Sequence, residues 1–125
     1  MNIFRTILRV AHLDRAEAFY TELLGTAGRR VGGGRIYFDC GPVILALLDA
    51  DAVSPGPDDL YFAVDDVDAV HARAAALGCL SRADVHGAPA GDVVRRPWGE
   101  RSFYAEDPWG NGLCFVDAAT TFTGR

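Results

Sequence analysis

The C-terminal part of the chain reads Arg101-Ser-Phe-Tyr-Ala-Glu-Asp-Pro-Trp-Gly-Asn-Gly-Leu-Cys-Phe-Val-Asp117. Two apolar runs, residues 102–105 and 113–116, are rich in the aromatic and β-branched side chains that favour strands. Between them, Asp107-Pro108 suits the opening of a turn, and Gly110-Asn111-Gly112 accepts positive φ at low cost. This stretch therefore predicts a β-hairpin near the C-terminus.

A weaker copy of this hairpin lies upstream. It reads Arg35-Ile-Tyr-Phe-Asp-Cys-Gly-Pro-Val-Ile-Leu-Ala-Leu-Leu48, again an aromatic run, a Gly/Pro turn and an apolar run. Gly32-Gly33-Gly34 precedes it, and because a strand rather than a helix follows these glycines, they predict a hairpin turn and not a phosphate-binding loop. The two copies indicate a doubled unit.

A strand and a helix precede the first hairpin. Residues 3–10 alternate between two faces with the period of a strand. Asp14 and Glu17 have the spacing of a capping box, with Asp14 at the N-cap, and apolar residues follow at helical spacing up to Gly25, a predicted left-handed C-cap.

The same pattern restarts after residues 49–58, which are rich in turn-forming and acidic residues and predict a linker. Residues 60–64 alternate, a helix capped by Asp66 or Asp68 follows and ends at Gly78, and the irregular residues 81–97 contain one strand around 92–95. An offset of 54 superposes Val10 on Val64. Module one thus covers about residues 1–50, the linker about 51–58 and module two about 59–125.

Each module is a β-α-β-β-β unit. Its helix covers only one face of its strands, so two modules side by side would form a curved, mostly antiparallel sheet whose second face lines a groove. The sequence therefore predicts one α+β domain over residues 1–125, built from paired βαβββ modules.

Composition narrows the function classes. Of the 125 residues 50% are hydrophobic, yet no apolar run approaches the ~20 residues of a membrane span, and Arg5 and Arg9 interrupt the N-terminal segment. Three cysteines without a CxxC pair predict reduced thiols and a cytoplasmic protein. A net charge of −5 disfavours nucleic acid as a partner, and Arg95, Arg96 and Arg101 are interpreted as a solvated rim.

The chain resembles the vicinal-oxygen-chelate superfamily, also called the glyoxalase / bleomycin resistance protein / extradiol dioxygenase group. Three segments carry the resemblance: residues 6–25 with Thr6-Ile-Leu-Arg-Val10 and Leu24-Gly25, residues 61–66, and residues 103–116. The resemblance implies paired βαβββ modules, homodimers, and, in the enzymes of the family, a divalent metal held by one ligand from each of four strands.

The metal ligands of those enzymes fall on four positions of this chain, which are Arg5, Ala46, Asp59 and Cys114. Arginine stays protonated and offers no lone pair, and alanine has no donor atom. Two remaining candidates are too few for a catalytic site, which normally has three protein ligands. The histidines at 12, 71 and 86 do not replace them, because they are expected in solvent. No cofactor is therefore expected.

The sequence thus favours a metal-independent small-molecule binding protein, in the manner of the drug-sequestering resistance proteins of the family, with a small-molecule ligand, a homodimeric state, and no membrane partner. Besides the four positions above, the expected groove residues mix apolar and polar groups. They are Ile7, Arg9, Tyr61, Ala63, Trp98, and Phe38 or Tyr104.

Several alternatives stay open. The chain could be a metal-dependent lyase or dioxygenase with an atypical site that uses Asp59 and Cys114, with Glu106 as a spare carboxylate, or a module that serves association alone. Trp98 could stack on a planar ligand or close the edge of the core. Arg5 and Asp59, which occupy the same position in the two modules, could form an ion pair or lie apart in solvent.

Overall fold

The computed structural model describes residues 1–50 and 59–125. The chain divides into two compact units, Met1–Gly56 and Pro57–Arg125, which are called the first and second unit below. The linker predicted over residues 51–58 lies outside the described residues. None of the described helices is long and apolar enough to cross a membrane.

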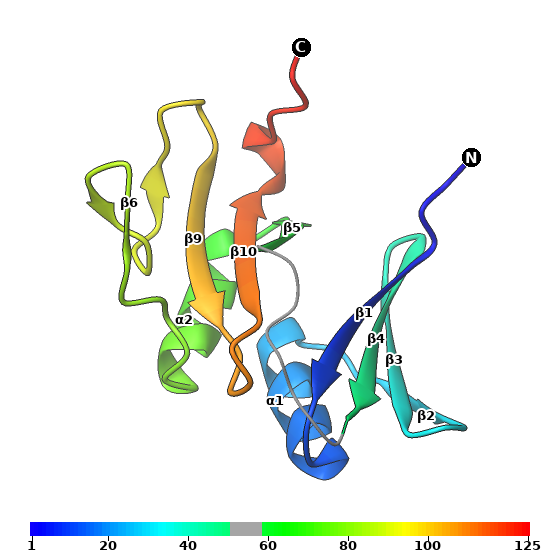
Figure 1. Cartoon of the computed structure of the whole chain (residues 1–125). Coiled ribbons are helices and arrows are strands. Elements are labelled where there is room, and N and C mark those ends of the chain that lie inside the picture. The colour runs from blue at the N-terminus through cyan, green and yellow to red at the C-terminus, as the bar shows by residue number, and fades with distance from the viewer. Residues whose placement is uncertain (51–58) are drawn as a thin grey trace. The chain divides into compact units, whose positions relative to one another are not determined.

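The first unit has the predicted β-α-β-β-β order (Figure 1). Its elements are β1 (Arg5–Val10), α1 (Leu13–Leu24), β2 (Arg29–Val31), β3 (Arg35–Cys40) and β4 (Val43–Asp49). They form a sheet of order β1-β4-β3-β2, in which β1 and β4 are parallel and the other pairs antiparallel. The predicted strand, helix and hairpin of this half are therefore confirmed.

The second unit repeats this order. Its elements are β5 (Leu60–Val64), α2 (Val67–Ala76), β6 (Asp84–Val85), β7 (Ala88–Pro89), β8 (Val94–Arg95), β9 (Arg101–Glu106), β10 (Gly112–Asp117) and a 3₁₀ turn over Ala118–Thr120. The sheet order is β5-β10-β9-β8, with β5 and β10 parallel. The small β6-β7 hairpin was not predicted, because strands of two residues leave no periodicity in the sequence.

The register of the two sheets supports the doubled unit. Ile7 lies opposite Ala46 in the first sheet, and Tyr61 lies opposite Cys114 in the second. Tyr61 follows Ile7 by the predicted offset of 54 residues. Each β-α-β-β-β unit therefore places equivalent residues at equivalent points of its sheet.

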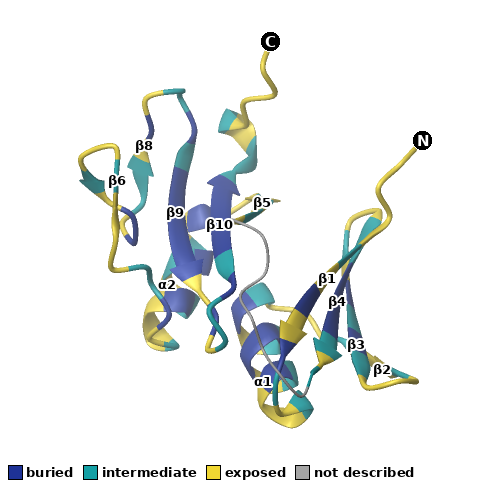
Figure 2. Cartoon of the chain, in the orientation of Figure 1, coloured by how far each residue is buried: buried dark blue, intermediate teal, exposed yellow. Residues whose placement is uncertain are grey.

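One face of each sheet is packed against a helix and forms a core, and the buried residues lie on the strands and on the helices that cover them (Figure 2). In the first unit, buried Tyr20 of α1 contacts Phe38 of β3 with ring centroids 6.2 Å apart. In the second, Phe115 stacks on Phe62 and Phe103 at 5.0 and 5.3 Å. Burial of each such ring stabilises its own unit by roughly 1.5–3 kcal/mol. The helix-covered face of each sheet therefore forms the core of that unit, and the opposite face is available for other roles.

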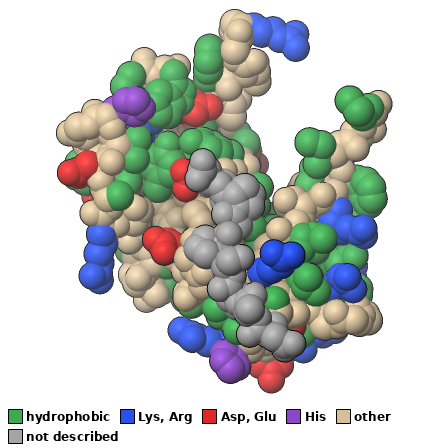
Figure 3. Space-filling view, in the orientation of Figure 1, with side chains coloured by type: hydrophobic (Ala, Val, Ile, Leu, Met, Phe, Trp, Pro, Cys, Tyr) green, Lys and Arg blue, Asp and Glu red, His purple; other side chains and the backbone are tan. Residues whose placement is uncertain are grey.

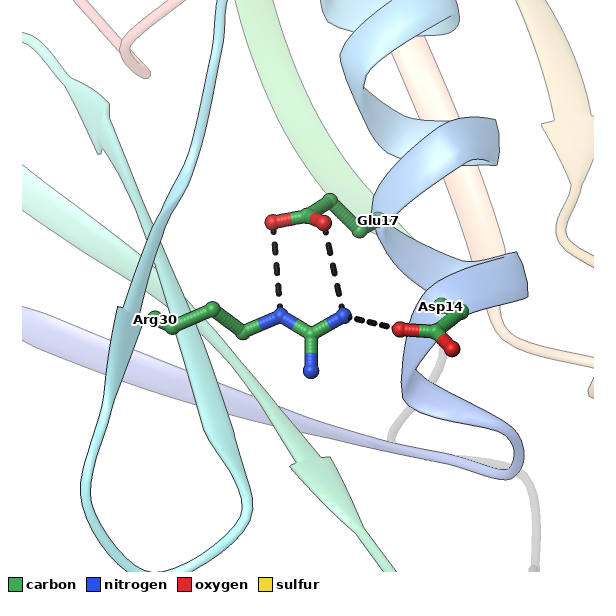
Figure 4. A network of polar contacts seen from close by, with 3 residues as sticks. All are labelled: Asp14, Glu17 and Arg30. Carbon is green, nitrogen blue, oxygen red and sulfur yellow. Dashed lines mark hydrogen bonds and ion pairs between the residues drawn. The ribbon is translucent and has the colours of Figure 1, made fainter.

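The predicted capping box of the first helix is wrong. α1 begins two residues earlier, with His12 at the N-cap at φ 56° and without a side-chain cap. Asp14 and Glu17 instead accept hydrogen bonds from the guanidinium of Arg30 on β2, at 2.5 and 3.3 Å from Nη2 (Figure 4). The earlier start of α1 moves the free backbone N–H groups away from these two carboxylates. The guanidinium of Arg30 is close to them and forms stronger, charge-assisted hydrogen bonds.

The other helix ends agree with the sequence. Gly25 closes α1 at φ 69°. Of the two candidates for the N-cap of α2, Asp66 holds the position, and its Oδ1 accepts the Ala69 N–H at 3.0 Å. Asp68 binds Arg101 instead, at 2.9 Å.

The closing hairpin forms as predicted, with one difference at its turn. Buried Asp107 accepts the backbone N–H groups of Trp109 and Asn111 at 2.9 and 2.8 Å, and Gly110 has φ 86°. Asn111 and Gly112 do not have positive φ. Gly112 instead leaves space for the carboxylate of Asp59, because a Cβ there would collide with Oδ1 of Asp59.

Candidate functional site

The open face of the first sheet carries exposed residues of β1, namely Arg5, Ile7 and Arg9. Arg5 donates a hydrogen bond to the hydroxyl of Tyr37 at 3.1 Å, and its guanidinium lies 5.2 and 5.7 Å from the ring centroids of Phe4 and Tyr37. The cation of Arg5 is thus engaged with aromatic side chains of its own unit.

Phe38, one of the two aromatic candidates for the groove, belongs to the opposite face. Its side chain is fully buried against α1. Because successive side chains of a strand alternate, its neighbour Tyr37 occupies the open face in its place. Tyr104, the other candidate, does lie on the open face of the second sheet with Cys114.

The open face of the second sheet holds a buried cluster of Ala90, Tyr104, Cys114 and Val116, against which Val85 packs. At its edge, the hydroxyl groups of Tyr61 and Tyr104 are 3.3 Å apart, and the two rings meet edge to face. Tyr61 is 53% exposed and Tyr104 only 6%. The sequence therefore brings Tyr61, Tyr104 and Cys114 together as predicted.

The segment that follows α2 builds the wall of this face. The Ser81 N–H donates to the Tyr104 carbonyl at 3.0 Å, and the Tyr104 N–H donates to the Ala90 carbonyl at 2.8 Å. His71 of α2 contacts the Gly91 carbonyl through Nε2 at 2.8 Å, so it is half-buried rather than free in solvent. These contacts hold Val85 and Ala90 beside β9.

Arg96, interpreted from the sequence as part of a solvated rim, is buried with 2% of its surface exposed. Its Nη2 donates to the carbonyls of Ser102, Asp92 and Ala90 at 2.9, 3.2 and 3.3 Å, and its Nε donates to the Ser102 hydroxyl at 3.1 Å. The guanidinium also lies 5.1 Å from the Tyr104 ring centroid. Arg96 thus ties the wall segment to β9 and supports Tyr104 from within the protein.

Both titratable groups at the centre of the cluster stay protonated at neutral pH. Burial raises the pKa of the Cys114 thiol to about 12, although hydrogen bonds with Ser102 and Tyr104 act in the other direction. Burial and the hydrogen bond with Tyr61 raise the pKa of Tyr104. Because thiolate is the form of cysteine that attacks electrophiles and ligates metals, Cys114 is chemically inert in this environment.

A cavity of about 220 Å³ opens on this face, entirely within the second unit. Its apolar wall consists of Ala83, Val85, Ala90, Tyr104 and Ala105. Its polar groups are Ser81 and two exposed carboxylates, Asp59 and Glu106. Gly110 and Gly112 also line the cavity, and because they have no side chains they contribute only backbone atoms. An apolar wall with a few polar groups is the usual composition of a small-molecule site. In Figure 3, the surface of the second unit likewise carries hydrophobic side chains with acidic ones among them.

The residues at the four predicted ligand positions do not fit a divalent metal. Arg5 cannot ligate and Ala46 has no donor, which leaves the carboxylate of Asp59 and the buried thiol of Cys114, fewer than the three protein ligands of a catalytic site. The neighbouring strands add no ligating side chain at these positions, because Arg5 lies beside Ile44 and Asp59 lies beside Gly112. Over residues 1–50 and 59–125, no three His, Cys, Asp or Glu side chains are grouped so that they could hold a metal ion.

Trp98 lies outside the lining of the cavity. Its Nε1 donates to Oε1 of buried Glu100 at 2.6 Å, and its ring meets the edge of His86 at 5.2 Å. Oε2 of the same Glu100 accepts the Phe122 N–H at 2.8 Å. Of the two interpretations of Trp98, these contacts favour a structural role that anchors the C-terminal segment.

Part of the site was not predicted from the sequence. Glu106 was considered only as a spare carboxylate of an atypical metal site, although its spacing of two residues from Tyr104 places both side chains on the same face of β9. The sequence contains no pattern that predicts the roles of Val85, Ala90 and Arg96, because these residues come from a segment without a regular hydrophobic period. Their position depends on contacts with β9, which is distant in the sequence.

Comparisons with known proteins agree with this fold. The family model of the Glyoxalase/Bleomycin resistance protein/Dioxygenase superfamily matches residues 2–115. No protein with a curated description matches the chain.

Solved structures give three informative likenesses. A lactoylglutathione lyase from Agrobacterium tumefaciens is 31% identical, with a TM-score of 0.66 and coverage of 93% of this chain and 92% of that one. The oxidase ChaP-H2 is 25% identical, with a TM-score of 0.76 and coverage of 94% and 93%. A bleomycin resistance determinant encoded on the transposon Tn5 is 17% identical, with a TM-score of 0.72 and coverage of 94% and 98%, which shows a common fold alone.

Proposed function

Since the chain belongs to the glyoxalase/bleomycin resistance protein/dioxygenase superfamily, we propose that it is a metal-independent small-molecule binding protein of this family, with sequestration of a drug or metabolite as its role. The fold alone does not decide this, because one fold serves many chemistries.

The cavity of the second unit is the observation that carries the proposal. It combines an apolar wall around Tyr104 with two carboxylates, and it contains no activated nucleophile, since the Cys114 thiol behind it keeps its proton. The residues at the predicted ligand positions of the family lack the donors for a catalytic metal. A site of this kind is suited to binding a molecule without transforming it.

Two substitutions to tryptophan test this assignment. Ala83 is exposed and lines the cavity, so Ala83→Trp narrows the site without entering the core, whereas Ala72→Trp places the same side chain on the exposed surface of α2. A thermal-shift screen in the presence of a chelator should identify ligands that stabilise the wild type and Ala72→Trp but not Ala83→Trp. Ligands that stabilise all three proteins equally would place the site elsewhere.

Native mass spectrometry on protein purified without chelators tests metal independence and assembly together. We expect a homodimer without bound metal, and an organic adduct would support the binding role. One divalent ion per chain would contradict the proposal.

A metal-dependent enzyme is the second candidate, and one observation favours it: the structure that is 31% identical is named a lactoylglutathione lyase. This candidate requires a metal site that uses Asp59. Stoichiometric binding of a divalent metal, lost in Asp59→Asn, would support the enzyme over the binding protein.

A further inference from the structure

We propose that the cavity of the second unit selects a cationic ligand, an organic ammonium whose charge lies between Asp59 and Glu106 and whose apolar part lies against Tyr104, Val85 and Ala90. This inference rests on the proposed binding function and names the chemical class of the ligand. Nothing in the family assignment specifies it.

The two carboxylates flank the same point of the sheet. Glu106 at the end of β9 lies opposite Gly112 at the start of β10, and the carboxylate of Asp59, which precedes β5, lies over Gly112 from the other side. Because β10 runs between β5 and β9, the two backbones are about two strand spacings apart, or ~10 Å. Gly112 has no side chain to fill the gap between them.

Among the described residues of the second unit that line the cavity, no cation occupies this gap. None of the side chains lining the cavity is basic. Among the residues that the structure describes, neither Asp59 nor Glu106 is part of an ion pair. Two carboxylates facing one cavity repel each other, so a cation between them is favoured and a second anion is disfavoured.

The apolar part of the cavity lining is suited to the remainder of such a ligand. Tyr104, Ala90 and Val85 belong to this lining, and the Tyr104 ring is held by Arg96 within the protein and by Tyr61 at its edge. A wall with fixed side chains loses little conformational entropy on binding. The volume of about 220 Å³ suits a small amine or the amine-bearing end of a larger molecule.

The charge of the second unit acts in the same direction. Residues 57–125 contain six arginines and eleven Asp and Glu residues, whereas residues 1–56 contain six of each kind. The net charge of −5 therefore belongs to the second unit. A negative potential around the cavity raises the local concentration of cations and repels anions.

Three probes of similar shape test the charge selectivity: benzylammonium, benzyl alcohol and benzoate. Binding can be followed at neutral pH through the NMR shifts of the Ala90, Gly110 and Gly112 amides, all at the cavity. We expect benzylammonium to bind more tightly than benzyl alcohol and benzoate to bind least. High salt should reduce the preference for the cation.

Substitutions then identify the charges responsible. Asp59→Asn and Glu106→Gln should each weaken benzylammonium binding by up to about fivefold, the upper end of the range for exposed charges, and leave benzyl alcohol unaffected. Gly112→Ala should have an effect similar to Asp59→Asn, because the new Cβ displaces the Asp59 carboxylate. Asp65→Asn is the matched control, since it removes an exposed charge at the other end of β5.

The outcomes separate this inference from the function on which it rests. Equal binding of the three probes at these amides, or benzylammonium binding that is unchanged in Asp59→Asn and Glu106→Gln, would overturn the cation selectivity and leave a small-molecule site in place. Absence of binding by all three probes would overturn the inference, and failure of the thermal-shift screen as well would overturn the function.

Discussion

Two arginines of this protein make similar polar contacts in opposite environments. Arg30 bonds Asp14 and Glu17 on the surface, with 45% of its side chain exposed, whereas Arg96 bonds three backbone carbonyls and a hydroxyl in a buried site. Water competes for the contacts of Arg30 more than for those of Arg96, which are largely buried. Removal of the Arg96 guanidinium therefore breaks hydrogen bonds that water does not readily replace.

We predict that Arg96→Met lowers the free energy of unfolding by about 3 kcal/mol, because it removes the hydrogen bonds of the guanidinium to the Ser102 hydroxyl and to the carbonyls of Asp92 and Ser102. Arg30→Met, which removes the same charge from the surface, should have a much smaller effect that high salt reduces further. Urea unfolding measures both. Equal losses in the two variants would contradict the account of Arg96.

Cys114 provides a pH-dependent prediction. Its raised pKa means that the folded protein keeps a proton that the unfolded chain releases above its ordinary pKa of 9.0. This contribution to stability is fully present below pH 9.0 and is lost as the pH rises towards about 12. The stability difference between wild type and Cys114→Ala should therefore shrink on going from neutral pH to about pH 11.

Urea midpoints in the presence of a reductant would measure this difference at each pH. A difference that stays constant over that range would mean that the Cys114 thiol does not titrate with unfolding.

At the scale of elements, the junction between α1 and β2 is packed closely against the core of the first unit. A Cβ at Gly28 would lie 2.8 Å from both Cγ2 of Ile36 and Cζ of Phe38, two side chains that are fully buried. Real Cβ contacts of this length are essentially never found, and the buried neighbours have no free space to move into.

Gly28→Ala should accordingly lower the free energy of unfolding by about 1–3 kcal/mol, the usual range for overpacking a core. Gly32→Ala is the control in the adjacent turn, because a Cβ there would meet no atom within 4 Å. Thermal or urea unfolding compares the two. If both variants were as stable as the wild type, the close packing of Gly28 would be disproved.

Elements with a strong local pattern were predicted well and those without one were not. The alternation of residues 60–64, the C-cap at Gly25 and the turn at Asp107 each depend on a few neighbouring residues. The capping box failed because Asp14 and Glu17 have a stronger partner in Arg30, more than ten residues away. Local rules describe an element until a tertiary contact competes with them.

At the scale of the molecule, two units with the same strand order differ in charge and in the chemistry of their open faces. The first presents Arg5 and Arg9 with Tyr37, and the second presents Asp59 and Glu106 around Tyr104. Doubling a β-α-β-β-β unit thus preserved the helix-covered cores, which require only apolar side chains of suitable size. The open faces were free to diverge.

The sequence by itself determined the two β-α-β-β-β units, their offset of 54 residues, and the absence of donors at Arg5 and Ala46. These features depend on periodicity, turn chemistry and residue type, which are local properties of the chain. Only the tertiary structure decided that Arg96 is buried, that Phe38 faces α1, and that Asp59 and Glu106 share a cavity across Gly112. The physical reason is that strand pairing joins residues about fifty positions apart, and the side chains meeting there are set by register, which no short stretch of sequence contains.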